Sequence, residues 1–207
     1  MAALVAEYPD VHPTFNPTPV LTRQPENLAA GTKDVYWALT EIPADELTDE
    51  QRRFVIDRFF DTNAGIVARF PRYQELIERR DRPAGFSTAD MRDLQILFNL
   101  AWTDPSFLAE EPLASLVAKE RNYTEEDKAI ILDEHERIIA EVLPLHAELW
   151  ESGQIEVSTT PLAHPILPLV ADSQLALVGD PTGMQPENRF RRPLDAVTQV
   201  ERGLDEA

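Results

Sequence analysis

The sequence predicts an α/β fold in which helices outnumber strands, and two observations carry that prediction. Apolar residues recur at intervals of three and four over much of the 207-residue chain, which is the spacing of helices with one buried face. Residues 153–169 combine a glycine, a β-branched run and prolines in an order that predicts the end of a helix, a strand, a loop and a new helix. In α/β folds, the loops that follow parallel strands commonly carry the binding site.

The N-terminal part predicts a helix, a strand and a second helix. Residues 2–8 form the first helix candidate. Residues 11–16 contain β-branched and aromatic side chains and predict a strand, although Pro13 cannot donate a hydrogen bond to a neighbouring strand. Residues 20–30 predict a helix that ends at Gly31.

The middle of the chain predicts several helices. Thr48 and Gln51 have the spacing of a capping box, which indicates a helix start. Residues 73–80 predict a short helix, and Ser87 or Thr88 would cap the next one. The apolar face of that next helix is Met91, Leu94, Phe98 and Ala101.

The longest predicted helix begins at Thr124, which Asp127 would complete as a capping box. Pro144 removes one hydrogen bond from this helix, so we expect a kink there. The spacing also fits a coiled coil, but a short run that contains a proline favours packing on its own domain. The predicted apolar stripe is Ile131, His135, Ile138, Val142, Leu145 and Leu149.

The C-terminal third predicts one strand and three helices. Gly153 suits the left-handed cap of the long helix, and residues 155–160 predict a strand. Pro165 is predicted in the first turn of a new helix. Residues 172–178 are predicted to be helical, and a helix from Pro193 would carry the apolar stripe of Leu194, Val197, Val200 and Leu204.

Three residues are candidates for binding a ligand. Glu156 lies between Ile155 and Val157, so its carboxylate points to the opposite face of the predicted strand. His164 lies in the loop after that strand, and Asn16 ends the first predicted strand. The alternative readings are an exposed or salt-bridged edge carboxylate, a histidine that only satisfies its loop, and an asparagine that caps a turn.

Several stretches resemble glycoside hydrolase family 57, whose members act on α-glucans, and in particular its amylase and amylopullulanase-like branch. Leu162 and Ala163 stand where that branch has an aromatic pair, which is a departure from its pattern. The stretches that carry the resemblance are Gly153-Gln-Ile-Glu156, Ser158-Thr-Thr-Pro161, His164-Pro-Ile-Leu-Pro-Leu169, and residues 7–16, 98–105 and 189–196.

The resemblance implies that residues 1–207 are part of a (β/α)7 TIM-like barrel. Residues 34–150 would then be a helical excursion between the second and third barrel strands. The resemblance also implies that the first strand, with its His-Gln-Pro motif, and the strands that carry the catalytic Glu and Asp lie outside this sequence. An incomplete barrel would expose sheet edges, so we expect self-association or marginal stability.

The resemblance further implies a retaining glycosidase or glucanotransferase that acts on starch, maltodextrin or pullulan. Such enzymes use a pair of carboxyl groups, but no residue here matches the catalytic Glu or Asp, so we assign no catalytic residue and expect the chain alone to be inactive. Glu156, His164 and Asn16 would contact the sugar. The alternative is a non-catalytic glycan-binding or scaffold protein derived from the same fold.

Composition and residue spacing argue against nucleic-acid binding, membrane association and a histidine metal site. The formal net charge of −18 disfavours nucleic acid and anionic membranes as partners. The chain has no cysteine, which fits a cytoplasmic location, and no apolar run approaches a transmembrane length. His135 and His146 would lie about 16 Å apart along one helix, too far to share a metal ion. We therefore expect no metal and no cofactor.

Overall fold

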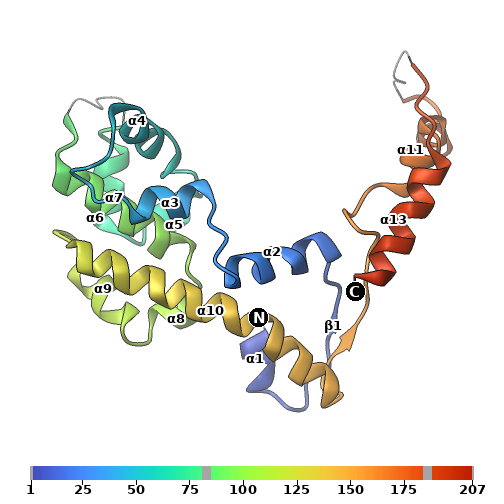
Figure 1. Cartoon of the computed structure of the whole chain (residues 1–207), viewed down its shortest axis with the longest axis horizontal. Helices are drawn as coiled ribbons and strands as arrows, with labels where there is room; N and C mark the ends of the chain where they lie inside the picture. The colour runs from blue at the N-terminus through green and yellow to red at the C-terminus, as the bar shows by residue number, and fades with distance from the viewer. Residues whose placement is uncertain (1, 81–84, 184–187, 207) are drawn as a thin grey trace. The chain divides into compact units, whose positions relative to one another are not determined.

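The computed structural model describes residues 2–80, 85–183 and 188–206 (Figure 1). The chain divides into two compact units. Unit 1 comprises Met1–Gly31 and Ile139–Ala207, and unit 2 comprises Thr32–Ile138. The boundary falls within the long helix α10 (Glu125–Glu151), which contributes residues to both units.

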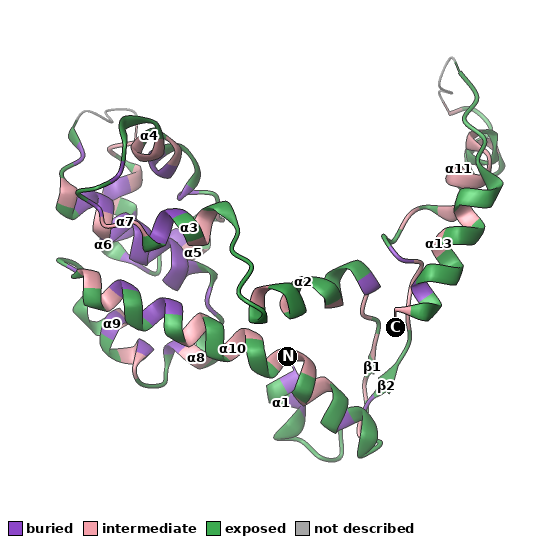
Figure 2. Ribbon diagram, in the orientation of Figure 1, coloured by how far each residue is buried: buried purple, intermediate pink, exposed green. Residues whose placement is uncertain are grey.

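Unit 2 is helical throughout its described elements, and α7 (Thr88–Trp102) lies in its core, buried along most of its length. Figure 2 shows buried residues on several helices of this unit. Two helices begin with capping boxes, at Thr48 and at Ser87. The sequence predicts the box at Thr48 and a cap at Ser87 or Thr88. The other helices of unit 2 are α3 (Val35–Glu41), α4 (Asp49–Arg58), α5 (Ala64–Val67), α6 (Pro71–Ile77), α8 (Pro105–Leu108), α9 (Leu113–Lys119) and the first part of α10.

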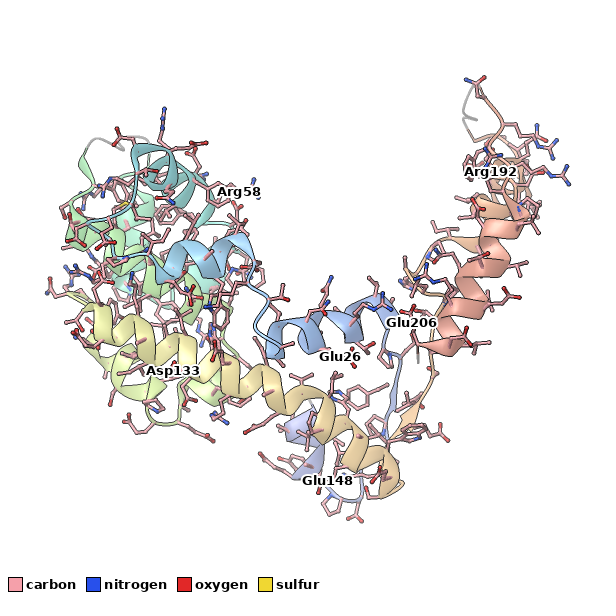
Figure 3. The ribbon with its side chains drawn as sticks, viewed as in Figure 1. Glu26, Arg58, Asp133, Glu148, Arg192 and Glu206 are labelled. Carbon is pink, nitrogen blue, oxygen red and sulfur yellow. The ribbon has the colours of Figure 1, made fainter. Side chains whose placement is uncertain are left out.

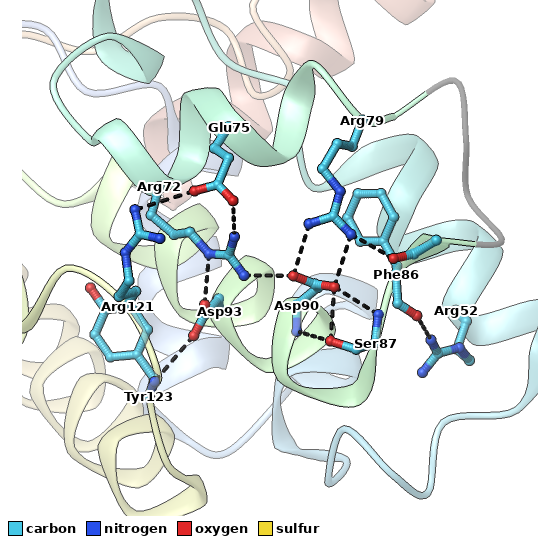
Figure 4. A network of polar contacts seen from close by, with 11 residues as sticks. Arg52, Arg72, Glu75, Arg79, Phe86, Ser87, Asp90, Asp93, Arg121 and Tyr123 are labelled. Atoms are coloured by element: carbon cyan, nitrogen blue, oxygen red, sulfur yellow. Dashed lines mark hydrogen bonds and ion pairs between the residues drawn. The ribbon is translucent and has the colours of Figure 1, made fainter.

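A buried arginine joins α6 to α7 (Figure 4). The Arg72 guanidinium donates to the carboxylates of Glu75 at 2.6 Å, Asp90 at 2.5 Å and Asp93 at 2.8 Å. Asp93 also accepts a hydrogen bond from the backbone N–H of Tyr123, at 3.1 Å. Because the charges are paired and hydrogen-bonded, they can remain ionised inside the helical unit.

Asp90 links this network to the start of α7. Burial would raise the pKa of Asp90, but hydrogen bonds from Arg79, Ser87 and Arg72 outweigh burial and hold that pKa well below its ordinary value. The same carboxylate completes the capping box of α7 by accepting from the backbone N–H of Ser87 at 2.7 Å. One side chain therefore both caps a helix and pairs with two arginines.

Unit 1 has a much smaller apolar core, formed by Ala2, Val5, Leu149 and Ile155. Its only strands among the described residues are β1 (Thr14–Phe15) and β2 (Glu156–Val157), which pair in parallel (Figure 1). Its helices are α1 (Ala2–Ala6), α2 (Pro19–Ala29), α11 (Leu167–Ala171), the 3₁₀ turn η2 (Ser173–Leu175), α12 (Ala176–Gly179), α13 (Pro193–Asp205) and the second part of α10.

The helix-rich character of the fold is confirmed, with a single pair of strands among the described residues, while several details differ from the sequence expectation. Both strands are shorter than predicted, and α3, α5, α8 and α9 were not predicted. The prediction for Pro165 was wrong: α11 begins at Leu167 and has Pro168 in its first turn. Gly153 does adopt the left-handed conformation, with φ +75°, after α10.

Two parallel strands do not make a barrel, and the (β/α)7 architecture remains a prediction. The same holds for the predicted excursion over residues 34–150, although residues 32–138 do form a compact unit. Within the described part of the chain, the helices are too short or too polar to cross a lipid bilayer.

Candidate functional site

The candidate site is built on the parallel pair β1 and β2. Thr14 lies opposite Glu156, and Phe15 lies opposite Val157. The Glu156 N–H donates to the carbonyl of Pro13 at 3.1 Å, and the Ser158 N–H donates to the carbonyl of Phe15 at 2.9 Å. Pro13 thus accepts a hydrogen bond from β2 through its carbonyl, which is possible because proline lacks only the backbone N–H.

The two faces of this pair differ in chemistry because side chains alternate along each strand. On one face, Phe15 and Ile155 join the small apolar core, where the Phe15 ring lies 5.1 Å from the ring of His146 on α10. The opposite face, which we call the polar strand face, consists of Thr14, Asn16, Glu156 and Ser158.

Hydrogen bonds connect the polar strand face across the two strands. The Thr14 hydroxyl donates to the Glu156 carboxylate at 3.1 Å. The Asn16 amide donates to the Ser158 hydroxyl at 2.8 Å. All four side chains are exposed, so the remaining lone pairs and protons face solvent. The face can accept and donate hydrogen bonds at once, as the vicinal hydroxyls of a sugar require.

Gln154, two residues before Glu156, holds the end of α1. Its side-chain amide donates to the carbonyl of Val5 at 2.8 Å and to the carbonyl of Tyr8 at 3.0 Å. The Gln154 carbonyl lies 3.1 Å from His12 Nδ1. This glutamine therefore ties the segment before β1 to the segment before β2, and its role is structural.

His164 is exposed and has an unusual backbone conformation. Its φ of +50° lies in the left-handed region that favours glycine. Its N–H donates to the carbonyl of Pro161 at 2.8 Å, which closes a tight turn. Such backbone geometry persists where the surroundings fix it and is common at binding sites. The described contacts do not join His164 to the polar strand face.

Leu162 and Ala163, the pair that departs from the family pattern, differ from each other in burial. Leu162 is buried, whereas Ala163 is exposed. Aromatic rings commonly stack on the faces of sugars. The Leu162 side chain is neither aromatic nor exposed, so it cannot make such a contact. The exposed position at 163 carries only a methyl group.

Sequence reasoning found Glu156 and Asn16 but not their partners Thr14 and Ser158. The signal was available, because Thr14 and Asn16 share one strand face, as do Glu156 and Ser158. Within residues 2–80, 85–183 and 188–206, no group of three or more His, Cys, Asp or Glu residues is placed to hold a metal ion.

Comparison with known proteins identifies one family. The family model described as "Glycosyl hydrolase family 57" matches residues 1–198 of the chain. No curated protein and no solved structure matches the chain.

Proposed function

The chain belongs to glycosyl hydrolase family 57, and we propose that it contributes sugar-binding residues to a retaining glycosidase or glucanotransferase that acts on α-glucans. Starch, maltodextrin and pullulan are the proposed substrates. The observation that carries the proposal is the polar strand face, on which Glu156 lies beside Thr14, Asn16 and Ser158.

Glu156 is the central residue of the proposed site. Thr14 donates one hydrogen bond to its carboxylate, which can accept several more because two oxygens offer about four lone pairs. Two neighbouring sugar hydroxyls can therefore donate to it together. A negative charge beside the sugar ring would also favour the oxocarbenium-like transition state of glycoside cleavage.

Asn16 and His164 have supporting roles in the proposal. The Asn16 amide donates to Ser158, and its carbonyl oxygen is available to accept from a hydroxyl. The exposed imidazole of His164 can donate to a sugar oxygen from the loop after β2. Neither residue is assigned a step in bond cleavage.

The two faces of β1 and β2 also support a barrel. In a (β/α) barrel, each strand turns one face to the surrounding helices and the other to the interior. Phe15 and Ile155 lie against α10 and α1 in the apolar cluster, which leaves the polar strand face for the interior. We propose that β1 and β2 are the second and third strands of a (β/α)7 barrel, with residues 34–150 as the excursion between them.

Calorimetric titration of the chain with maltoheptaose tests the binding site. We expect Glu156→Gln to weaken binding roughly tenfold or more, since hydrogen bonds to a charged group are lost. Glu151→Gln, which changes an exposed glutamate at the end of α10, is the matched control and should bind as the unaltered chain does. Equal affinities for the two variants would refute the role of Glu156.

A turnover assay on starch, maltodextrin and pullulan separates binding from catalysis. We assign no carboxylate of this chain to the catalytic pair, so we expect binding without release of reducing ends. Clear turnover by the pure chain would show that the pair is present after all. Binding without turnover is also what a non-catalytic glycan-binding protein would show.

A further inference from the structure

Helix α13 holds the segment that carries His164. We call residues 160–164 the anchored segment. The helices that hold it, α2 and α13, belong to the same unit 1. Helix α13 contributes no residue to the sequence motif around Glu156 or to the polar strand face. Its contact with the anchored segment is therefore a separate feature of unit 1.

Gln199 of α13 binds the anchored segment twice. Its backbone carbonyl accepts a hydrogen bond from the N–H of Leu162 at 2.9 Å. Its side-chain oxygen accepts from the N–H of Ala163 at 3.0 Å. A carbonyl oxygen has two lone pairs, so a residue inside a helix can make the first bond in addition to its helical one. Gln199 thus fixes two successive peptide groups immediately before His164.

Gly203, one turn further along α13, permits this close approach. It is buried, and a Cβ atom at this position would lie 2.7 Å from the Thr160 carbonyl oxygen and 2.9 Å from the Leu162 nitrogen. No carbon atom can occupy such a position without displacing the backbone it meets. The glycine is therefore required for α13 to lie directly on the anchored segment.

The anchored segment is also held from α2. The Leu162 carbonyl accepts from the N–H of Val20 at 3.1 Å, and the Leu162 side chain is buried. Arg23 of α2 pairs with Glu206, which follows α13 and is labelled in Figure 3. Leu162 is thus fixed through its N–H, its carbonyl and its side chain, whereas Ala163 and His164 are exposed beside it.

We propose that Gln199 and Gly203 are positioning residues for sugar binding, which act by fixing the backbone from which His164 projects. This inference rests on the proposed function, in which His164 contacts the glucan. The left-handed backbone of His164 fits this role, because such a conformation needs a fixed neighbourhood. Without the bond to Ala163, the turn would sample other conformations and His164 would meet the sugar less often.

Titration calorimetry with maltoheptaose tests this inference on three variants of the chain. Gln199→Ala removes the acceptor for the Ala163 N–H and keeps a good helix former. Gln199→Glu restores an acceptor oxygen at the same reach. Gln24→Ala changes an exposed glutamine of α2 and is the matched control. We expect Gln199→Ala to weaken binding roughly three- to tenfold, as for one lost hydrogen bond, and the other two to bind normally.

A double-mutant cycle distinguishes positioning from general stability. If Gln199 acts through His164, Gln199→Ala should weaken binding in the unaltered chain and have no further effect in a His164→Ala background. Equal weakening in both backgrounds overturns the inference, as does unchanged binding by Gln199→Ala. These two results leave the proposed function standing. Absence of maltoheptaose binding by the unaltered chain overturns the proposed function and this inference together.

Discussion

Unit 1 and unit 2 differ in the interactions that stabilise each of them internally. Unit 2 buries a continuous apolar core around α7 and encloses the paired charges of Arg72, Asp90 and Asp93 within it. Unit 1 buries a small cluster and leaves most of α13 exposed, with Gly203 as its buried residue. The candidate sugar-binding residues all lie in unit 1. The part of the molecule proposed to bind substrate thus depends on hydrogen bonds between short segments rather than on a large core.

Removal of the buried arginine should produce the largest effect. Arg72→Ala leaves the Asp93 carboxylate buried without its main partner, and we expect a loss of about 3–5 kcal/mol in the unfolding free energy of unit 2. Arg121→Ala is the matched control: its guanidinium is about half exposed and pairs with Glu75 at 3.2 Å, so its loss should cost about 1 kcal/mol or less. Urea denaturation followed by helical circular dichroism measures both. Similar losses would show that the buried network is not what stabilises unit 2.

A pair of leucines compares the two units directly. Leu94 is fully buried in α7, so Leu94→Ala should cost about 2–5 kcal/mol. Leu204 of α13 is 66 % exposed, so Leu204→Ala should change stability by about 0.5 kcal/mol or less. Urea denaturation followed by circular dichroism measures the unfolding free energy of both variants. A large loss from Leu204→Ala would mean that the α13 stripe is covered in solution, and sedimentation velocity would then reveal the self-association expected from the sequence.

Two glycines test how closely unit 1 is packed around α13. Gly203→Ala places a carbon against the backbone of Thr160 and Leu162, and we expect a loss of about 1–3 kcal/mol. At Gly179, by contrast, an added Cβ would meet nothing within 4 Å, so Gly179→Ala should be neutral or slightly stabilising. Thermal unfolding of the two variants gives the comparison. If Gly203→Ala were harmless, the close approach of α13 would be unnecessary.

The smallest effect expected is the pH dependence of unit 2 near neutrality. Burial lowers the pKa of His135, whose Nε2 lies 2.8 Å from the Thr103 hydroxyl and whose ring lies beside Trp37, while Glu134 opposes the shift. In the unfolded chain the histidine pKa is about 6.5. Just below that pH the unfolded chain binds a proton at this histidine, whereas the folded chain binds it only at lower pH. The free energy of unfolding should therefore fall as the pH drops through about 6.5.

His135→Gln isolates this contribution. The amide can still bond to the Thr103 hydroxyl but does not titrate, so the fall in stability between pH 7 and pH 5.5 should flatten. The carboxylates with lowered pKa values, such as Asp90 and Glu125, lose their contributions only at lower pH and do not interfere. Denaturation midpoints across this range measure the slope, and an unchanged slope would refute the assignment to His135.

Local signals in the sequence predicted much of the helical structure. The capping boxes at Thr48 and Ser87 depend on residues three positions apart, and the reciprocal bonds between Thr124 and Asp127 are also present. Four helices were not predicted: α3, α5, α8 and α9. They have four to seven residues, too few to show a helical period. Their positions are set by the core that they cover.

The candidate site could be predicted only in part because its partners are distant in sequence. Alternation placed the carboxylate of Glu156 away from Ile155 and Val157, and it is exposed. That Thr14 donates to it depends on the register of β1 and β2, which the sequence of either strand alone does not specify. The contact between Gln199 and Ala163 likewise depends on how α13 packs, and no local sequence pattern predicts it.

The register of β1 and β2 also bears on the order in which the chain folds. Thr14 meets Glu156 across 142 residues, and the conformational entropy lost in closing a loop grows with its length. Two paired residues per strand offset little of that loss. Unit 2 needs neither strand to bury its own core. During synthesis we therefore expect unit 2 to fold before β1 pairs with β2, so that the polar strand face forms later than the helical core.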